Sequence, residues 1–222
     1  MPPNHWMENF IAIQTLIESS GENSDDLAVE LRRNGMAHIS FSQISTVEAC
    51  PYRYFLQYIR FEEPVPAPDY FTKGKLLHEL IAASYREGIR GEPPGADGPA
   101  ARIGAKFNGD AARHLQNAFE THRENRWQDC QVMGVEKPFV MMLEPDLPPC
   151  VGVIDLILKK DEKIILIDHK TGRDFYPDDE LQMAIYMEYL RQAFGEEECE
   201  FYYEHYRWVN NLERIRKPAF QR

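Results

Sequence analysis

The most restrictive feature of the chain is a pair of nearly continuous apolar runs in residues 151–170, VGVIDLILKKDEKIILIDHK. Runs of Val, Ile and Leu without a polar face are typical of strands buried on both sides, as in the centre of an α/β sheet. Asp161 and Glu162 lie between the runs and predict a tight turn. We therefore expect adjacent strands at 151–160 and 163–169.

Each apolar run is interrupted by a carboxylate, Asp155 in the first and Asp168 in the second. Both residues lie about six positions from the turn, so they can face each other across the strand pair, with Cβ atoms about 5 Å apart. Two carboxylates at such a short distance repel each other unless a cation lies between them. A divalent metal ion is such a cation. Lys170 follows Asp168 by two residues and therefore points to the same face of its strand. A solvated surface hairpin is the alternative interpretation of this pattern.

The rest of the chain alternates between helical and strand patterns in its second half and is mainly helical in its first half, which predicts an α/β fold. In 42–59 we expect two helical segments, with Pro51 at the first position of the second. Residues 91–99 are a Pro/Gly-rich loop. The expected helices are 6–19, 24–35, 72–88 with Thr72 as cap, 100–128 and 178–194, and the further strands are 135–143 and 199–209.

Length, charge and cysteine content limit the class of protein. The 222 residues suit one domain with a small helical appendage, and a net charge of −11 argues against coating nucleic acid by bulk electrostatics. No apolar run approaches the roughly 18–20 residues of a membrane span, and the N-terminus does not resemble a signal peptide. The four widely spaced cysteines read as reduced thiols, so we expect a cytoplasmic protein.

The order of motifs along the second half resembles the PD-(D/E)xK nuclease superfamily. GVIDLI, LIDHKTG and LQMAIY follow one another as in its RecB-like branch, which includes helicase-nuclease exonuclease domains and CRISPR-associated RecB-like nucleases. That branch has an Asp on one strand, D/E-x-K on the next and Q-x-x-x-Y on the following helix. The matching residues are Asp155, Asp168, Lys170, Gln182 and Tyr186.

The resemblance extends upstream over residues 39–208. GKLLHEL supplies His78 after Gly74, as in the branch, and STVEACPYRYFLQYI matches its "CP" helix. The resemblance implies a restriction-endonuclease-like core with a central mixed β-sheet flanked by helices, plus a helical N-terminal half. It divides the chain into an N-terminal helical segment, 1–38, and a nuclease domain, 39–222.

The chemistry that the resemblance implies is phosphodiester hydrolysis with Mg²⁺ or Mn²⁺. An imidazole in the ligand shell suits Mn²⁺ better than Mg²⁺. Lys170 would position or activate the attacking water, and Gln182 and Tyr186, on one helix face, would hold Lys170 or contact DNA. The implied metal ligands are His78, Asp155, Asp168 and the backbone carbonyl of His169.

Several of these residues also have structural interpretations. A lone histidine such as His78 on an amphipathic helix is more often structural, and the ordered motif reverses that preference. The side chain of His169 points away from Asp168 and is expected to be structural. Glu136 is as plausible a support of the site as a bystander. Arg53, Tyr54, Tyr58 and Arg60 could form a nucleic-acid surface, but we favour a core stripe for this segment.

Some RecB-like nucleases hold an iron–sulfur cluster with one upstream cysteine and three near the C-terminus. Cys50 matches the upstream position, but only Cys199 follows Lys170. Three thiolates are therefore missing from the expected place, and we predict no cluster.

The resemblance thus implies a DNA exonuclease acting on single strands or duplex ends, in recombination, repair, phage DNA processing or CRISPR adaptation. The source would be prokaryotic or phage, and any helicase, recombination or CRISPR partner would be a separate protein. The alternative is a catalytically silent nucleic-acid-binding or assembly module, against which the intact motif residues argue.

Overall fold

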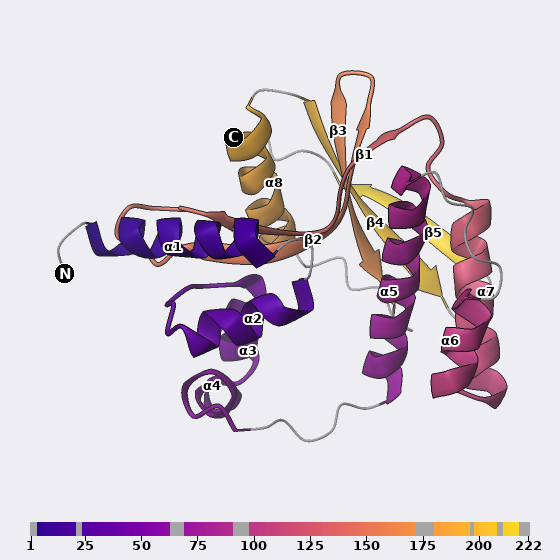
Figure 1. Cartoon of the computed structure of the whole chain (residues 1–222), viewed down its shortest axis with the longest axis horizontal. Coiled ribbons are helices and arrows are strands. Elements are labelled where there is room, and N and C mark those ends of the chain that lie inside the picture. The colour runs from indigo at the N-terminus through magenta and orange to yellow at the C-terminus, as the bar shows by residue number, and fades with distance from the viewer. Residues whose placement is uncertain are drawn as a thin grey trace. The chain divides into compact units, whose positions relative to one another are not determined.

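The computed structural model describes residues 4–20, 24–62, 69–90, 98–171, 180–195, 198–207 and 211–217 (Figure 1). Its helices are α1 (Asn4–Ser20), α2 (Ser24–Arg33), α3 (Phe41–Ala49), α4 (Pro51–Tyr54), the π-helix η1 (Phe55–Ile59), α5 (Asp69–Arg90), α6 (Gly98–Lys106), α7 (Gly109–Glu124) and α8 (Glu180–Phe194). Its strands are β1 (Gln131–Met141), β2 (Cys150–Lys160), β3 (Lys163–Lys170), β4 (Glu198–Arg207) and β5 (Asn211–Lys217). Of the helices described, none has the length and apolar content that a bilayer crossing needs.

The five strands form one mixed sheet in the order β1-β2-β3-β4-β5. Strand β2 pairs antiparallel with β3, β3 parallel with β4, and β4 antiparallel with β5. Helix α8 lies in the connection between the parallel strands β3 and β4, as such a pair requires. This arrangement confirms the predicted α/β class with a central mixed sheet.

The chain divides into two compact units. Unit 1 comprises 1–66, 136–154 and 179–196, and unit 2 comprises 67–135, 155–178 and 197–222. Strands β1 and β2 each begin in one unit and end in the other, so that the strands themselves connect the units along the chain.

Unit 2 is built on a core between helices α5, α6 and α7 and one face of the sheet. Figure 1 shows α6 and α7 beside α5, and α7 contacts both of the other helices. Alternate residues of β2 and β3 point into this core, since successive side chains of a strand face opposite ways. The buried apolar residues include Leu76, Leu77, Leu80, Ile81, Tyr85, Leu115, Phe119, Leu156, Leu158, Ile165 and Ile167.

The β2–β3 hairpin has the predicted turn. Lys160 pairs with Lys163, which leaves Asp161 and Glu162 as the two connecting residues. Asp161 has a φ of 53°, and Asp is one of the few residues that adopt this left-handed conformation readily.

Unit 1 has its own smaller core, formed by Ile13, Leu27, Leu31 and Val151. The extended piece before α3 pairs with the start of β2 through an Ile39–Cys150 bridge, and the Ser40 side chain caps α3 by accepting the N–H of Gln43. Pro51 begins α4, as predicted.

Several predicted elements differ from those observed. Helix α5 begins at Asp69, so Thr72 lies inside the helix and does not cap it. The helical stretch predicted for 100–128 consists of α6 and α7, with a break at residues 107–108, and β5 was not predicted. Most of the predicted loop at 91–99 lies outside the described residues, and its last two residues begin α6.

Candidate metal centre

Asp155 and Asp168 come together on neighbouring strands of unit 2. In the antiparallel register Leu156 pairs with Ile167, and continuing that register by one step brings Asp155 opposite Asp168. The backbone N–H of His169 donates to Asp155 Oδ2 over 2.7 Å, which fixes the Asp155 carboxylate against β3. The hairpin therefore gives the juxtaposition expected from its apolar pattern.

His78 reaches the same carboxylate from α5. Its Nδ1 lies 3.5 Å from Asp155 Oδ2. Gly74, one turn earlier on α5, packs against the residue that follows β3, because a Cβ atom at this position would lie only 2.6 Å from Thr171 Oγ1. The glycine before the histidine thus lets α5 approach the end of β3 that carries Asp168 and Lys170.

Lys170 is held beside Asp168. Its Nζ lies 3.0 Å from Asp168 Oδ2 and 5.3 Å from the centre of the Tyr203 ring. Tyr203 pairs with Asp168 across the β3–β4 register, so all three side chains occupy one face of the sheet. The ammonium is therefore oriented by an ion pair and a cation–π contact.

The two carboxylates differ in how well the protein compensates their charge. Burial raises the pKa of Asp168; Lys170 partly opposes this effect, and the negative charge of Asp155 adds to it. Burial also acts on Asp155, but the His78 imidazole and the His169 N–H outweigh it and lower the pKa of that carboxyl. The surroundings of Asp168 thus disfavour its charged form, whereas those of Asp155 favour it.

This donor set fits a divalent metal ion. Carboxylates are ordinary ligands of Mg²⁺ and Mn²⁺, and an imidazole suits Mn²⁺ better than Mg²⁺. A bound cation would offset the burial and the Asp155 charge that together raise the Asp168 pKa. His78 and Asp155 supply ligand atoms close enough to share one ion.

Glu136 lies on β1, at the point where the chain passes from unit 2 to unit 1. The residue before it, Val135, is buried in unit 2. Its φ is 48°, an uncommon conformation for a glutamate inside a strand. Strained backbone positions gather at functional sites, so this conformation favours a functional interpretation over that of a bystander.

Gln182 and Tyr186 contact each other on one face of α8 in unit 1. Gln182 Nε2 donates to the Tyr186 hydroxyl over 3.0 Å, and this hydroxyl donates to the carbonyl of Val153 over 2.8 Å. Both side chains are buried. Val153 precedes Asp155 by two residues on β2, so this hydrogen-bond chain fixes the strand segment that leads to Asp155.

The opposite face of β3 carries a buried polar network that the sequence did not predict. His169 pairs with Glu204 across the β3–β4 register, and its Nδ1 lies 3.3 Å from Glu204 Oε2. Its side chain therefore faces away from Asp168, as expected. The Glu204 carboxylate also accepts hydrogen bonds from Trp127, Tyr206 and Arg214.

The network continues from Glu204 into the helices of unit 2. The Tyr206 hydroxyl lies 3.0 Å from His122 Nδ1 on α7, and His122 Nε2 lies 3.1 Å from Ser84 Oγ on α5. Burial opposes the ionisation of Glu204, but His169 and Arg214 outweigh it and lower its pKa to about 2. No sequence motif marks these residues, since their partners come from distant parts of the chain.

The segment from Pro51 to Arg60 does not form the core stripe that we favoured. Neither α4 nor η1 contains a buried residue, and Phe55 and Ile59 are exposed. Cys50 caps α4, because its Sγ accepts the N–H of Arg53 over 3.4 Å. The aromatic residues here therefore lie at or near the surface of unit 1.

Comparisons with known proteins agree with this arrangement. The family model of the PD-(D/E)XK nuclease superfamily matches residues 38–208. Among solved structures, a "Putative exonuclease" from Eubacterium rectale is similar in fold, with a TM-score of 0.57 and 10% identity, over 82% of this chain and 73% of that one. No curated protein matches. Since the family model covers most of the chain and the fold agrees, the chain belongs to the PD-(D/E)XK nuclease superfamily.

Proposed function

We propose that the chain is a metal-dependent deoxyribonuclease of the RecB-like branch that acts as an exonuclease. The observation that carries this proposal is the buried Asp155–Asp168 pair, whose second carboxylate has a raised pKa and an ammonium 3.0 Å away. Structural carboxylates are ordinarily compensated by protein groups, whereas a metal centre keeps charge available for its ion. The family match and the ordered Gln182 and Tyr186 positions support the same reaction.

His78, Asp155, Asp168 and the carbonyl of His169 would hold Mg²⁺ or Mn²⁺, which when bound supplies Lewis acidity and lowers the pKa of a coordinated water. Lys170, oriented by Asp168, would hydrogen-bond a water or the charge that develops on the phosphate. Gln182 and Tyr186 act by positioning β2 before Asp155 and by contacting DNA. We propose Glu136 as a supporting carboxylate, on the strength of its strained backbone.

The proposal is tested with end-labelled single-stranded and duplex DNA in Mn²⁺. Wild type should degrade both the single-stranded and the duplex substrate, since each has free ends. Asp168→Ala and Lys170→Ala should degrade neither. Lys163→Ala is the matched control, since it removes a lysine at the other end of β3 that pairs with Glu200. Equal activity in wild type and the three variants would contradict the nuclease assignment. Cleavage of closed circular DNA would contradict the assignment as an exonuclease.

The choice of metal tests His78 separately. Because an imidazole ligand suits Mn²⁺, Mn²⁺ should support cleavage at least as well as Mg²⁺. A metal titration in which Mg²⁺ supports cleavage and Mn²⁺ does not would count against His78 as a direct ligand. We keep the prediction that no iron–sulfur cluster is present; a brown protein after anaerobic purification would contradict it.

The biological setting and the division into 1–38 and 39–222 stay predictions. They include a cytoplasmic protein of a prokaryote or phage, working with a separate helicase, recombination or CRISPR protein in recombination, repair, phage DNA processing or CRISPR adaptation. The alternative of a silent assembly module predicts DNA binding that Asp168→Ala leaves unchanged and no cleavage by any variant.

A further inference from the structure

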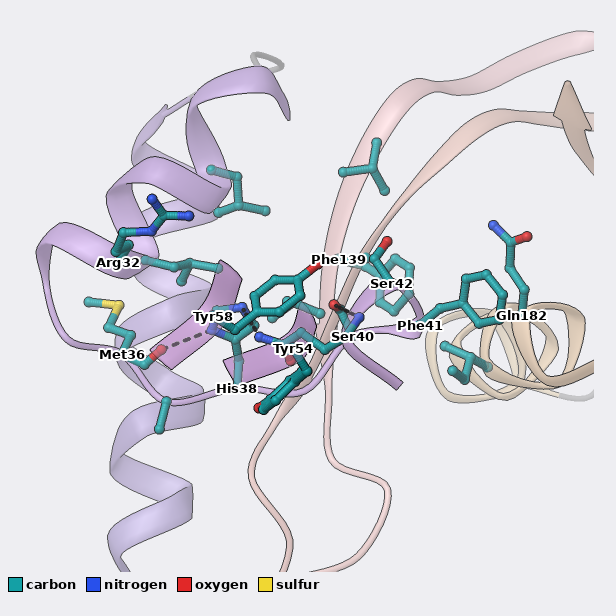
Figure 2. A pocket seen from close by; sticks show the side chains of 18 of the residues that line it. Arg32, Met36, His38, Ser40, Phe41, Ser42, Tyr54, Tyr58, Phe139 and Gln182 are labelled. Atoms are coloured by element: carbon teal, nitrogen blue, oxygen red, sulfur yellow. Dashed lines mark hydrogen bonds between the residues drawn. The ribbon is translucent and has the colours of Figure 1, made fainter. Parts of the chain in front are cut away.

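Unit 1 contains a cavity of about 670 Å³ that the metal centre does not use. Its lining residues all belong to unit 1. They come from α2, the segment between α2 and α3, the start of α3, the end of α4, η1 and the residues after it, β1, β2 and α8. Figure 2 shows them extending from Arg32 and Met36 at one end to Gln182 at the other, with Tyr54 and Tyr58 between. This volume lies in the range of about 300–1,000 Å³ that is usual for small-ligand sites.

The lining combines aromatic faces with short polar side chains. Phe41, Tyr54, Tyr58 and Phe139 contribute rings, and the Tyr54 and Tyr58 rings lie 5.2 Å apart. Polar groups at the wall include Ser40, Ser42, Gln43 and His38. Flat rings beside hydrogen-bonding groups are the surroundings in which proteins bind nucleobases, which have two π faces and polar edges.

The charge of the cavity differs from that of the chain. Although the net charge is −11, the described lining contains no aspartate or glutamate, and Arg32 contributes a guanidinium. Arg32 lies over the Phe61 ring, 4.8 Å from its centre. The cavity therefore suits a ligand in which a negatively charged group is attached to an aromatic one, as in a nucleotide.

Two unusual backbone features form part of the same wall. Tyr58 and Ile59 belong to the π-helix η1, and single π turns occur often at functional sites. Phe61 has a φ of 54°, which is strained for a residue with a Cβ atom. A wall that served only to pack unit 1 would not require either feature.

We propose that this cavity receives one unpaired nucleotide of a single-stranded DNA, with its base against Tyr58 and its phosphate beside Arg32. The proposal rests on the proposed nuclease function, for which it specifies a substrate with an unstacked base. Gln182 and Tyr186 line the cavity and also hold Val153, two residues before Asp155. Occupation of the cavity therefore bears on the strand that carries the first carboxylate.

Binding without turnover provides the first test. Fluorescein-labelled oligothymidine and an abasic oligomer of equal length carry the same phosphates, so their difference in affinity for the full chain in EDTA reports base binding alone. We expect oligothymidine to bind about tenfold or more tightly, since stacking on one ring has about this effect. Equal affinities would overturn the proposal.

Matched variants then assign the preference to the cavity. Tyr58→Leu keeps apolar bulk but removes the π face and should reduce the preference for oligothymidine, whereas Tyr58→Phe should retain it. Ser42→Trp fills the cavity without opening a core and should also reduce the preference. Tyr52→Ala is the control, because Tyr52 is an exposed aromatic residue of α4 outside the lining. Equal losses in Tyr52→Ala and Tyr58→Leu would place binding on the outer surface and overturn the cavity assignment.

The two proposals fail in different ways. All affinities are measured in the Asp168→Ala background as well, where cleavage is absent. A base preference that persists there without any cleavage by wild type would overturn the nuclease assignment alone. Cleavage by wild type without a base preference would overturn the nucleotide site alone.

Discussion

Two buried carboxylates lie on opposite faces of the sheet, Asp168 on β3 and Glu204 on the neighbouring strand β4, and their pKa values shift in opposite directions. On one face Glu204 of β4 accepts from Trp127, Tyr206 and Arg214, and its pKa is lowered to about 2. On the other face Asp168 has Lys170 beside it, yet its pKa is raised. Both carboxylates are almost inaccessible to solvent, so exposure does not account for the difference. The difference lies in the neighbouring groups: His169 and Arg214 lower the pKa of Glu204, whereas burial and the negative charge of Asp155 outweigh Lys170 at Asp168.

We interpret this contrast as the difference between a structural carboxylate, Glu204, and the proposed metal ligand Asp168. A carboxylate surrounded by protein donors stabilises the fold and has little capacity left for a ligand. A carboxylate next to a second carboxylate keeps a charge that an external cation can neutralise. Substitution at Glu204 should therefore affect stability, and substitution at Asp168 should affect turnover.

The largest effect is expected for cleavage by Asp168→Asn. Removing this proposed metal ligand should cost several kcal/mol of transition-state stabilisation, so the cleavage rate in Mn²⁺ should fall by about 10³-fold or more. Asp161→Asn is the control, because it makes the same chemical change in the turn of the same hairpin, where asparagine tolerates the positive φ. Comparable losses in both variants would indicate that the hairpin fold, and not the carboxylate, is the source of the effect.

Glu204→Gln should act on stability. The amide cannot accept from all the donors that Glu204 satisfies, and its partners Trp127, Tyr206 and Arg214 lose a charge-assisted bond. Breaking a buried pair of this kind costs about 3–5 kcal/mol in the free energy of unfolding, which urea denaturation measures. An unchanged unfolding midpoint would place Glu204 in the same class as Asp168.

Low pH should reduce the stability that the Glu204 network contributes. The pKa of Glu204 is lowered from 4.5 to about 2, so its contribution is complete above about pH 4.5 and is lost as the pH falls towards 2. This single group should account for about 3 kcal/mol of the loss between pH 5 and 2. Urea unfolding of wild type and Glu204→Gln over this range measures it, and their stabilities should converge at low pH. Parallel curves would exclude Glu204 as the acid-sensitive group.

The sequence predicts the functional face better than the structural one for a physical reason. Asp155, Asp168 and Lys170 belong to one hairpin, where the alternation of strand side chains and a two-residue turn determine which groups meet. Gly74 and His78 are related by one helical turn. Glu204, in contrast, finds Trp127 at a separation of 77 residues, and no local pattern encodes such a contact.

The Pro51–Arg60 segment shows a second limit of sequence reasoning. Its aromatic spacing is the same for a buried stripe and for a ring-lined surface, and only the tertiary environment distinguishes them. The π turn at Phe55–Ile59 also shifts the side chains away from the directions of a regular α-helix. Strand β5 was missed because NLERIRK alternates charged with apolar residues too weakly to predict a strand.

His78→Ala should have an intermediate effect. Its imidazole contacts Asp155, so its loss should weaken the metal centre by about 10- to 100-fold and reduce any preference for Mn²⁺ over Mg²⁺. Cleavage rates over a titration of each metal measure both quantities. His114→Ala, a partly exposed histidine on α7, is the control. If the rate fell without a change in metal dependence, His78 would orient Asp155 without being a ligand.

The smallest effect is expected for the stability of Asp168→Asn without metal, and it tests the comparison most directly. Burial penalises the Asp168 charge and Lys170 only partly offsets this, so neutralising it should raise the free energy of unfolding in EDTA at neutral pH. A rise of the pKa from 3.8 to about 6 represents roughly 3 kcal/mol, of which we expect Asn to recover about 1 kcal/mol, since an amide does not reproduce the contacts of a protonated carboxyl. Asp155→Asn should instead lower it, because the Asp155 carboxylate accepts from the His169 N–H. Saturating Mn²⁺ should make wild type more stable than Asp168→Asn. Binding of the metal at about 100 times Kd adds about 2.7 kcal/mol to the free energy of unfolding of wild type and little to that of either variant. A loss of stability in Asp168→Asn without metal would mean that Lys170 compensates Asp168 as fully as Glu204 is compensated, and the two faces of the sheet would then be alike.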